Sequence, residues 1–214
     1  LLFEVSENTV RAETETLGAL ALAGDLAQSQ SSQNEAYLQE RLRDVVAVPP
    51  RLYGSIDAAK VRIEPRKQAE KQEKNEAWRD MKVGCWYETE EVSPKRCSTR
   101  ERAKQERDAV IYRAKNIRYY CDIAEASEFG KLMWGQGCRE QADWARELIF
   151  VCDGATWIWK LVEQYYPQAV QIVDWYHAEE RLERVAQEAF PNRAMREAWL
   201  KETQSSLWEG QVAE

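Results

Sequence analysis

Several features that would point to a membrane, a metal cluster or a secretory route are scarce in this 214-residue sequence. No run approaches the ~20 consecutive apolar residues that a membrane-spanning helix requires. The five cysteines form no Cys-x-x-Cys pair and His177 is the only histidine, which argues against a zinc cluster and fits a reducing cytosol. Residues 1–4 contain no basic segment and no small-residue cleavage site, so a secretory signal is not expected.

Charge is unevenly distributed along the chain. The formal net charge is -7, but residues 51–118 hold 18 Lys and Arg against 12 Asp and Glu. Residues 1–50 and 119–214 are both acidic. A basic middle between acidic ends leaves a polyanionic partner such as DNA possible, although composition does not identify one.

The amino-terminal segment predicts one short helix. Ser6 is a favourable N-cap residue, and Gly18 stands where a helix ending near Leu17 would have its C-cap. Short polar residues at the start of a helix are typical of the recognition helix of a helix-turn-helix, and equally of an ordinary capped surface helix. The candidate DNA contacts are Ser6, Asn8, Thr9 and Arg11. We expect a polar linker at 28–34, a second helix at 36–46 and a boundary near Pro49.

The remaining sequence alternates between strand and helix patterns. Strands are predicted at 51–63, 81–88, 117–123, 148–152 and 169–173, and helices at 127–144, 155–165, about 182–189 and a final segment with Trp199 and Trp208. The order β-β-β-α-β-α-β-α predicts an α/β fold with a mixed sheet, of the ribonuclease H-like, retroviral integrase type. In that layout the first, fourth and fifth strands are parallel neighbours.

Three acids stand at predicted strand ends, where they would share one rim of such a sheet. They are Asp57, Asp153 and Asp174. Carboxylates held this close repel one another unless a cation lies between them, and oxygen ligands favour Mg²⁺ or Mn²⁺. Each acid alone would more often be a turn former or a helix cap. The same holds for His177, three residues after Asp174, which alone would more often be a packed or capping residue.

The longest distinctive motif is Val151–Trp159, VCDGATWIW. With Phe129–Gly130, Tyr165–Pro167 and Asp174–Glu179 (DWYHAE), it resembles bacterial insertion-sequence DDE transposases of the ISKra kind, relatives of the Mutator-like transposases. The resemblance implies an enzyme that cleaves DNA and transfers strands by two-metal chemistry with Mg²⁺ or Mn²⁺. It also implies double-stranded DNA partners (terminal repeats and target DNA), a homo-oligomer in the active complex and a cytoplasmic, nucleoid-associated location without a membrane anchor.

The resemblance assigns roles to individual residues. Asp57 and Asp153 match catalytic acids that bind the metal, and Asp174 with His177 matches a hallmark Asp-x-x-His element near the active site. The amino-terminal helix resembles the tail of a helix-turn-helix DNA-binding region.

Two departures from the family pattern qualify this assignment. Ala58 and Ala59 follow Asp57 where the family usually has glycine. The family's third acid is a Glu on a helix after a long helical insertion, so we expect it beyond residue 214, in a chain that is a fragment lacking both ends and inactive alone. The expected parts are a helical segment at 1–48, the ribonuclease H-like domain at 49–190 and the start of the insertion at 191–214. Alternatives are a noncatalytic DNA-binding relic and a ribonuclease H-like nuclease.

The basic run within 95–107 gives a testable prediction about DNA affinity. Its candidate contacts are Arg96, Arg100, Arg102 and Lys104. Reversing these charges is expected to weaken DNA binding and to flatten its salt dependence by roughly one counterion per lost phosphate contact. A filter-binding titration at several salt concentrations measures both effects, and an unchanged salt slope would exclude this run as a DNA contact.

Overall fold

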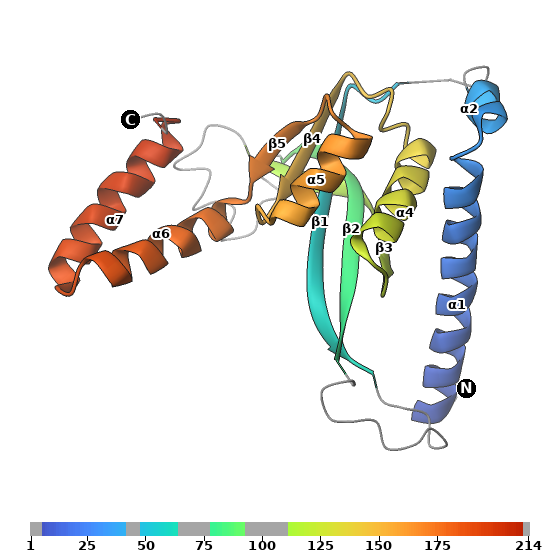
Figure 1. The fold of residues 1–214 in the computed structure, drawn as a ribbon, viewed down its shortest axis with the longest axis horizontal. Coiled ribbons are helices and arrows are strands. Elements are labelled where there is room, and N and C mark those ends of the chain that lie inside the picture. The colour runs from blue at the N-terminus through green and yellow to red at the C-terminus, as the bar shows by residue number, and fades with distance from the viewer. Residues whose placement is uncertain (1–5, 42–47, 64–77, 93–110, 212–214) are drawn as a thin grey trace.

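The computed structural model describes residues 6–41, 48–63, 78–92 and 111–211. They form an α/β fold with a five-stranded mixed sheet, which confirms the prediction of an α/β protein with a mixed sheet (Figure 1). The helices are α1 (Glu7–Ser31), α2 (Glu35–Arg41), α4 (Ala126–Arg139), α5 (Thr156–Tyr165), α6 (Trp175–Ala189) and α7 (Arg193–Trp208). The strands are β1 (Arg51–Arg62), β2 (Trp78–Glu91), β3 (Tyr112–Asp122), β4 (Glu147–Cys152) and β5 (Val170–Val173).

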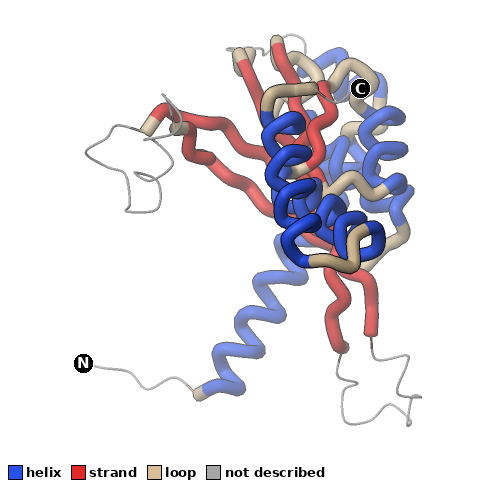
Figure 2. Tube along the Cα trace, turned by 90° about the vertical axis from the view of Figure 1, so that its left-hand side faces the viewer, coloured by secondary structure: helices blue, strands red, loops and turns tan. Residues whose placement is uncertain are grey.

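The sheet has the order β3-β2-β1-β4-β5. β1, β2 and β3 are antiparallel neighbours, whereas β4 runs parallel to both β1 and β5. The parallel pairing of β1 ends at Gly54, opposite Phe150, but its pairing with β2 continues to Arg62. The β1–β2 pair therefore extends beyond the rest of the sheet as an arm (Figures 1 and 2).

Helices α4 and α5 cover one face of the sheet. The α4 residues Phe129, Leu132 and Met133 are buried at the spacing of a helix face, and α5 contributes Ile158 and Val162. These side chains meet the even-numbered residues of the central strands, which are the core of the protein. The opposite face of β1, β2 and β3 is only partly buried.

The prediction of a short first helix is wrong. Ser6 does cap α1, because its Oγ accepts a hydrogen bond from the amide of Thr9, but the helix continues past Gly18 to Ser31. The segment predicted as a linker at 28–34 supplies the last turn of this helix. Tertiary packing explains the difference, because Ser29 and Ser32 are buried where α1 lies against α4.

Other boundaries differ by a few residues. β2 and β3 both begin earlier than predicted, since cross-strand pairing carries them along the arm and the β2–β3 hairpin. α4 ends at Arg139 rather than 144, and Gln141 follows with a φ of 59°. The basic run within 95–107 lies outside the described residues.

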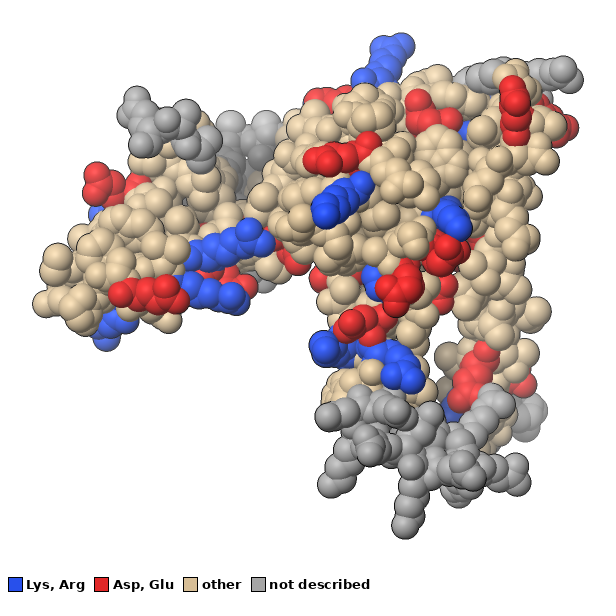
Figure 3. All heavy atoms as spheres, in the orientation of Figure 1, with Lys and Arg blue, Asp and Glu red and all other residues tan. Residues whose placement is uncertain are grey.

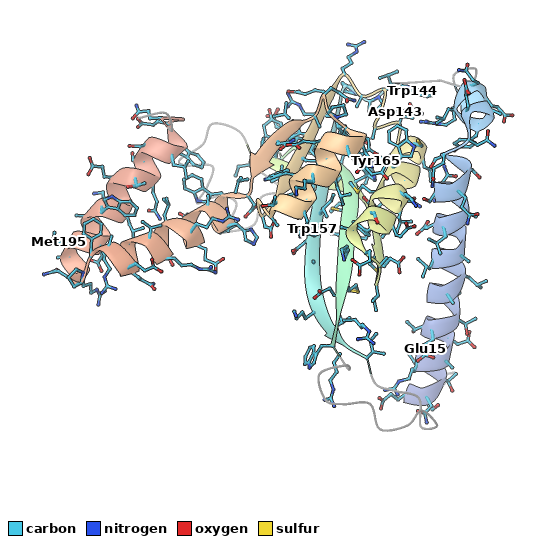
Figure 4. The ribbon with its side chains drawn as sticks, viewed as in Figure 1. Glu15, Asp143, Trp144, Trp157, Tyr165 and Met195 are labelled. Carbon is cyan, nitrogen blue, oxygen red and sulfur yellow. The ribbon has the colours of Figure 1, made fainter. Side chains whose placement is uncertain are left out.

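The amino-terminal helices are fastened to the sheet layer through α4 and the loop after it. Arg41 of α2 binds both carboxylate oxygens of Asp143, at 3.0 and 3.1 Å, and its guanidinium lies 4.4 Å from the ring centre of Trp144. Figure 4 shows Asp143 and Trp144 close to α2. Trp134 of α4 donates a hydrogen bond to the Ser32 carbonyl. No helix in the described part of the chain is long and apolar enough to cross a membrane.

The close approach of α1 and α4 predicts the effect of one substitution. A Cβ at Gly135 would lie 2.6 Å from the Cα of Ser29, a backbone atom that moves only if the helices separate. Gly135→Ala is therefore expected to lower the free energy of unfolding by about 1–3 kcal/mol, measured by urea denaturation. Gly18→Ala is the matched control, because a Cβ there meets nothing within 4 Å and alanine favours the helix by about 0.5–1 kcal/mol. Equal stability of the two variants would contradict the α1–α4 packing.

Candidate functional site

A cavity of about 350 Å³ opens at the carboxyl ends of the parallel strands. Every strand except β5 lines it, together with the residues that follow β4 and β5. It brings Asp57, Asp153, Asp174 and His177 into one place from separate parts of the sequence. Asp57 and Asp153 are the acids that the resemblance matched to catalytic metal ligands, and Asp174 and His177 form its Asp-x-x-His element. The cavity is lined by Ser55, Ile56, Asp57, Cys85, Tyr87, Ala114, Ile117, Tyr119, Val151, Cys152, Asp153, Asp174 and His177.

Asp57 reaches the cavity from within a strand. The expectation that it ends β1 is wrong, because Asp57 pairs with Val83 of β2 and the strand continues beyond it. Asp57 nevertheless lies just past Gly54, where the pairing of β1 with β4 ends. Between them, Ser55 donates a hydrogen bond to the Val151 carbonyl. The Asp57 carboxylate accepts a hydrogen bond from the amide of Ala58 at 2.7 Å. Two-sided pairing of β1 stops here, and this places the carboxylate at the rim.

Asp153 lies in the tight turn between β4 and α5. Its Oδ1 accepts a hydrogen bond from the amide of Ala155 at 2.8 Å, and its carbonyl accepts one from Arg181 of α6 at 2.9 Å. Gly154 has a φ of 83°, which only glycine adopts without strain, and the Arg181 guanidinium lies over it. Hydrogen bonds from Ala155 and Arg181 thus fix the turn, and the Asp153 carboxylate has a defined position.

Asp174 is the N-cap of α6. Its Oδ1 accepts hydrogen bonds from the amides of Tyr176 and His177, at 2.9 and 3.4 Å. The Nδ1 of His177 lies 3.3 Å from the same oxygen. The Asp174 amide donates to the Cys152 carbonyl at 2.7 Å, which sets this junction beside the Asp153 turn. Asp174 therefore both caps α6 and lines the cavity.

The charge of the cavity suits a hard cation. Three carboxylates line it, and the described lining residues include neither lysine nor arginine. Asp57 and Asp153 each use one oxygen in a backbone hydrogen bond, which leaves the second oxygen of each for a ligand. Carboxylate oxygens are the ligands that Mg²⁺ and Mn²⁺ prefer. In the described residues, however, no group of three or more His, Cys, Asp and Glu side chains is arranged to hold a metal ion.

The two cysteines of the cavity are unsuited to nucleophilic chemistry. Burial raises the pKa of the Cys152 thiol to about 12, and the carboxylates of Asp153 and Asp57 add to this effect. Burial likewise raises the pKa of Cys85. Both side chains therefore remain neutral thiols at physiological pH, and a thiolate is the form that attacks or binds metal. The chemistry of the cavity rests on oxygen and imidazole groups.

The predicted DNA contacts fall into two groups. Ser6, Asn8, Thr9 and Arg11 are exposed at the start of α1, where Arg11 lies 4.0 Å from Glu7. This end of α1 points toward the same end of the molecule as the tip of the β1–β2 arm (Figures 1 and 2). Basic side chains gather along the outer part of that arm (Figure 3), where the sequence has Lys60, Arg62 and Arg79. The second group, Arg96, Arg100, Arg102 and Lys104, lies outside the described residues.

Sequence reasoning missed two contributors to the site. Arg181 carries no motif signal, because its role depends on α6 crossing back over the Asp153 turn. The sequence pattern predicts only that Tyr119 belongs to a strand. In the structure Tyr119 is 70% exposed and lines the cavity opposite the acids. The alternation of Tyr119 with the buried Tyr120 was the available signal for its outward position.

An α/β protein with an acidic cavity at the carboxyl ends of parallel strands is the class that the fold and the site define. No protein-family model and no curated protein matches the chain. The geometry of the cavity is therefore the evidence for the function of this chain.

Asp174 both caps α6 and lines the cavity, and two substitutions are expected to separate these roles. Asn caps helices as well as Asp does, so Asp174→Asn is expected to change the free energy of unfolding by less than about 0.5 kcal/mol. Asp174→Ala loses the capping bonds and is expected to cost about 0.5–2 kcal/mol. Urea denaturation measures both values. If Asp174→Asn destabilises the protein as much as Asp174→Ala, the charge of Asp174 rather than its capping bonds stabilises α6.

Proposed function

We propose that this chain carries the catalytic centre of a DDE-type DNA transposase with a ribonuclease H-like sheet, which cleaves DNA and transfers strands at insertion-sequence ends. The observation that carries the proposal is the meeting of Asp57, Asp153, Asp174 and His177 in one cavity. Three antiparallel strands followed by two parallel ones, β4 and β5, with helices between them, support the fold assignment.

The proposed metal ligands are Asp57 and Asp153, with Mg²⁺ or Mn²⁺ as the cofactor. When bound, such cations activate an attacking oxygen and stabilise the leaving oxygen of a phosphodiester. The chain supplies rigid placement: Asp57 stands on a paired strand, and Asp153 stands on a turn held by Ala155 and Arg181. His177 is oriented through Nδ1 by Asp174, so its Nε2 is available to a DNA phosphate.

The proposed DNA surface runs from the cavity along the β1–β2 arm. The outer part of the arm carries Lys60, Arg62 and Arg79 against Asp80, within a chain of net charge -7. Basic side chains steer a polyanion toward the surface that they occupy. In this proposal the arm and the start of α1 hold duplex DNA while the acidic cavity receives the reacting strand.

A noncatalytic DNA-binding relic is the second candidate, and a specific observation favours it. Within the described ranges no third carboxylate joins Asp57 and Asp153 in a group arranged to hold a metal ion. A two-ion site needs enough acids to neutralise and position both ions. The relic would bind DNA through the basic middle without cutting it.

Metal binding tests the assignment of the two ligands. Removing even an outer partner of a metal ligand typically weakens metal binding about 10–100-fold. Asp57→Asn and Asp153→Asn are each expected to weaken Mn²⁺ binding by at least about tenfold, measured by isothermal titration calorimetry. Asp80→Asn is the matched control, because Asp80 is an exposed carboxylate of β2 outside the cavity. Equal Mn²⁺ affinity in all variants would exclude the cavity as the cation site.

Cleavage assays then separate the candidate functions. The chain alone, with Mn²⁺, is expected to bind plasmid DNA and leave it intact, because in the described residues no third carboxylate completes a metal-binding group with Asp57 and Asp153. Metal-dependent DNA cleavage that Asp57→Asn abolishes would show that a local acid completes the site. Cleavage of an RNA–DNA hybrid but not of duplex DNA would instead support the ribonuclease H-like nuclease.

A further inference from the structure

The cavity has a second wall whose chemistry is unlike that of the acids. Ala114, Ile117 and Tyr119 of β3 and Tyr87 of β2 form it. Tyr119 is 70% exposed and Ile117 is 40% exposed, although both are apolar or aromatic. A carboxylate-lined rim and an exposed aromatic ring thus border the same space.

Strand geometry determines which side chains reach this wall. Tyr120 is buried against Met133 and Phe129, so its neighbour Tyr119 projects from the opposite face. A β-bulge interrupts the β2–β3 pairing between Trp86 and Glu88, and Asn116 there has a φ of 51°. The extra residue changes the alternation, and Ala114 and Ile117 consequently share one face.

Tyr87 gives the wall a rigid base. Its ring stacks on that of Tyr53 with 5.2 Å between ring centres and 12° between planes. Burial raises the pKa of Tyr87 to about 12, so its hydroxyl stays protonated. Among the described aromatic residues, by contrast, Tyr119 has no stacking partner. Its exposed ring is available to a ligand.

The dimensions of the cavity limit what that ligand is. Its volume of about 350 Å³ is at the low end of the range of about 300–1,000 Å³ typical of small-molecule sites. A space of this volume accommodates one nucleotide-sized group. In a duplex the faces of the bases are stacked on one another, whereas an unpaired base offers its face to an aromatic side chain.

We infer that Tyr119 stacks on an unpaired base at the end of a DNA strand, and that the cavity takes a frayed or single-stranded end rather than a paired one. The inference rests on the proposed function, which places the strand's phosphate at the acids. The acidic wall receives the phosphate together with the cation, and the aromatic wall receives the adjacent base. Tyr119 is then a residue that determines substrate specificity.

DNA binding by the full chain in Mn²⁺ tests this inference. The probes are two fluorescein-labelled DNA hairpins, one blunt and one with a short unpaired 3′ end, followed by fluorescence anisotropy. Stacking on one base corresponds to about fivefold to a hundredfold in affinity, and Tyr119→Ala is expected to lose this factor on the unpaired end alone. Tyr119→Phe keeps the ring and is expected to keep the preference.

Tyr112→Ala is the matched control for this experiment. Tyr112 belongs to the same strand and is 62% exposed, but it does not line the cavity. Its loss is expected to leave both affinities unchanged. An equal loss on blunt and unpaired probes for Tyr119→Ala would overturn the inference. If Tyr119→Ala has no effect while Asp153→Asn still weakens binding, the stacking inference is wrong and the proposed function stands. If neither variant affects binding, both are wrong.

Discussion

The packing of three aromatic rings, two of them against Gly54, is the constraint on which the rest of the structure depends. Trp86, Phe150 and Tyr166 lie with ring centres 5.4 to 5.5 Å apart, and each comes from a different part of the fold. A Cβ at Gly54 would lie 2.6 Å from the Phe150 ring and 2.9 Å from the Trp86 ring, so both rings lie over β1 only because residue 54 is glycine. The Tyr166 hydroxyl donates to the Met133 carbonyl and joins α4 to this cluster. The cluster thereby holds β1, β2, β4 and both covering helices in register.

The cavity lies where the pairing of β1 with β4 ends. Beyond Gly54, β1 loses β4 as a partner but keeps β2, and a space opens at the carboxyl ends of the parallel strands. Asp57 enters it from the continuing strand, and Asp153 and Asp174 enter it from the turns after β4 and β5. Each acid uses one oxygen for a local backbone hydrogen bond. The same bonds that order the turns therefore orient the carboxylates toward the cavity, and structural and chemical roles are combined in each residue.

Much of the fold was predictable because its signals are local. The continuous apolar run of β4, the spacing of Phe129, Leu132 and Met133, and the capping residues Ser6 and Asp174 are properties of short segments. Three wrong boundaries share one cause, which is that distant contacts extend α1, β2 and β3 beyond their predicted limits. α1 continues past Gly18 because its last turns pack on α4, and β2 and β3 begin early because they pair with neighbouring strands. A glycine or an acid ends a helix or strand only where tertiary contacts do not stabilise its continuation.

By itself the sequence determined the α/β class and the acids that follow the strands, since hydrophobic periodicity and residue chemistry act over a few positions. Tertiary structure alone decided that Asp57, Asp153, Asp174 and His177 share one cavity. It also decided that Tyr119 faces them, because strand pairing places Tyr119 beside Cys85 on the cavity's side of the sheet, where the ring is exposed. The physical reason is the distance along the chain over which each interaction acts. A local sequence pattern specifies which face of a helix or strand a side chain occupies, whereas strand pairing and packing specify which residues lie opposite that face.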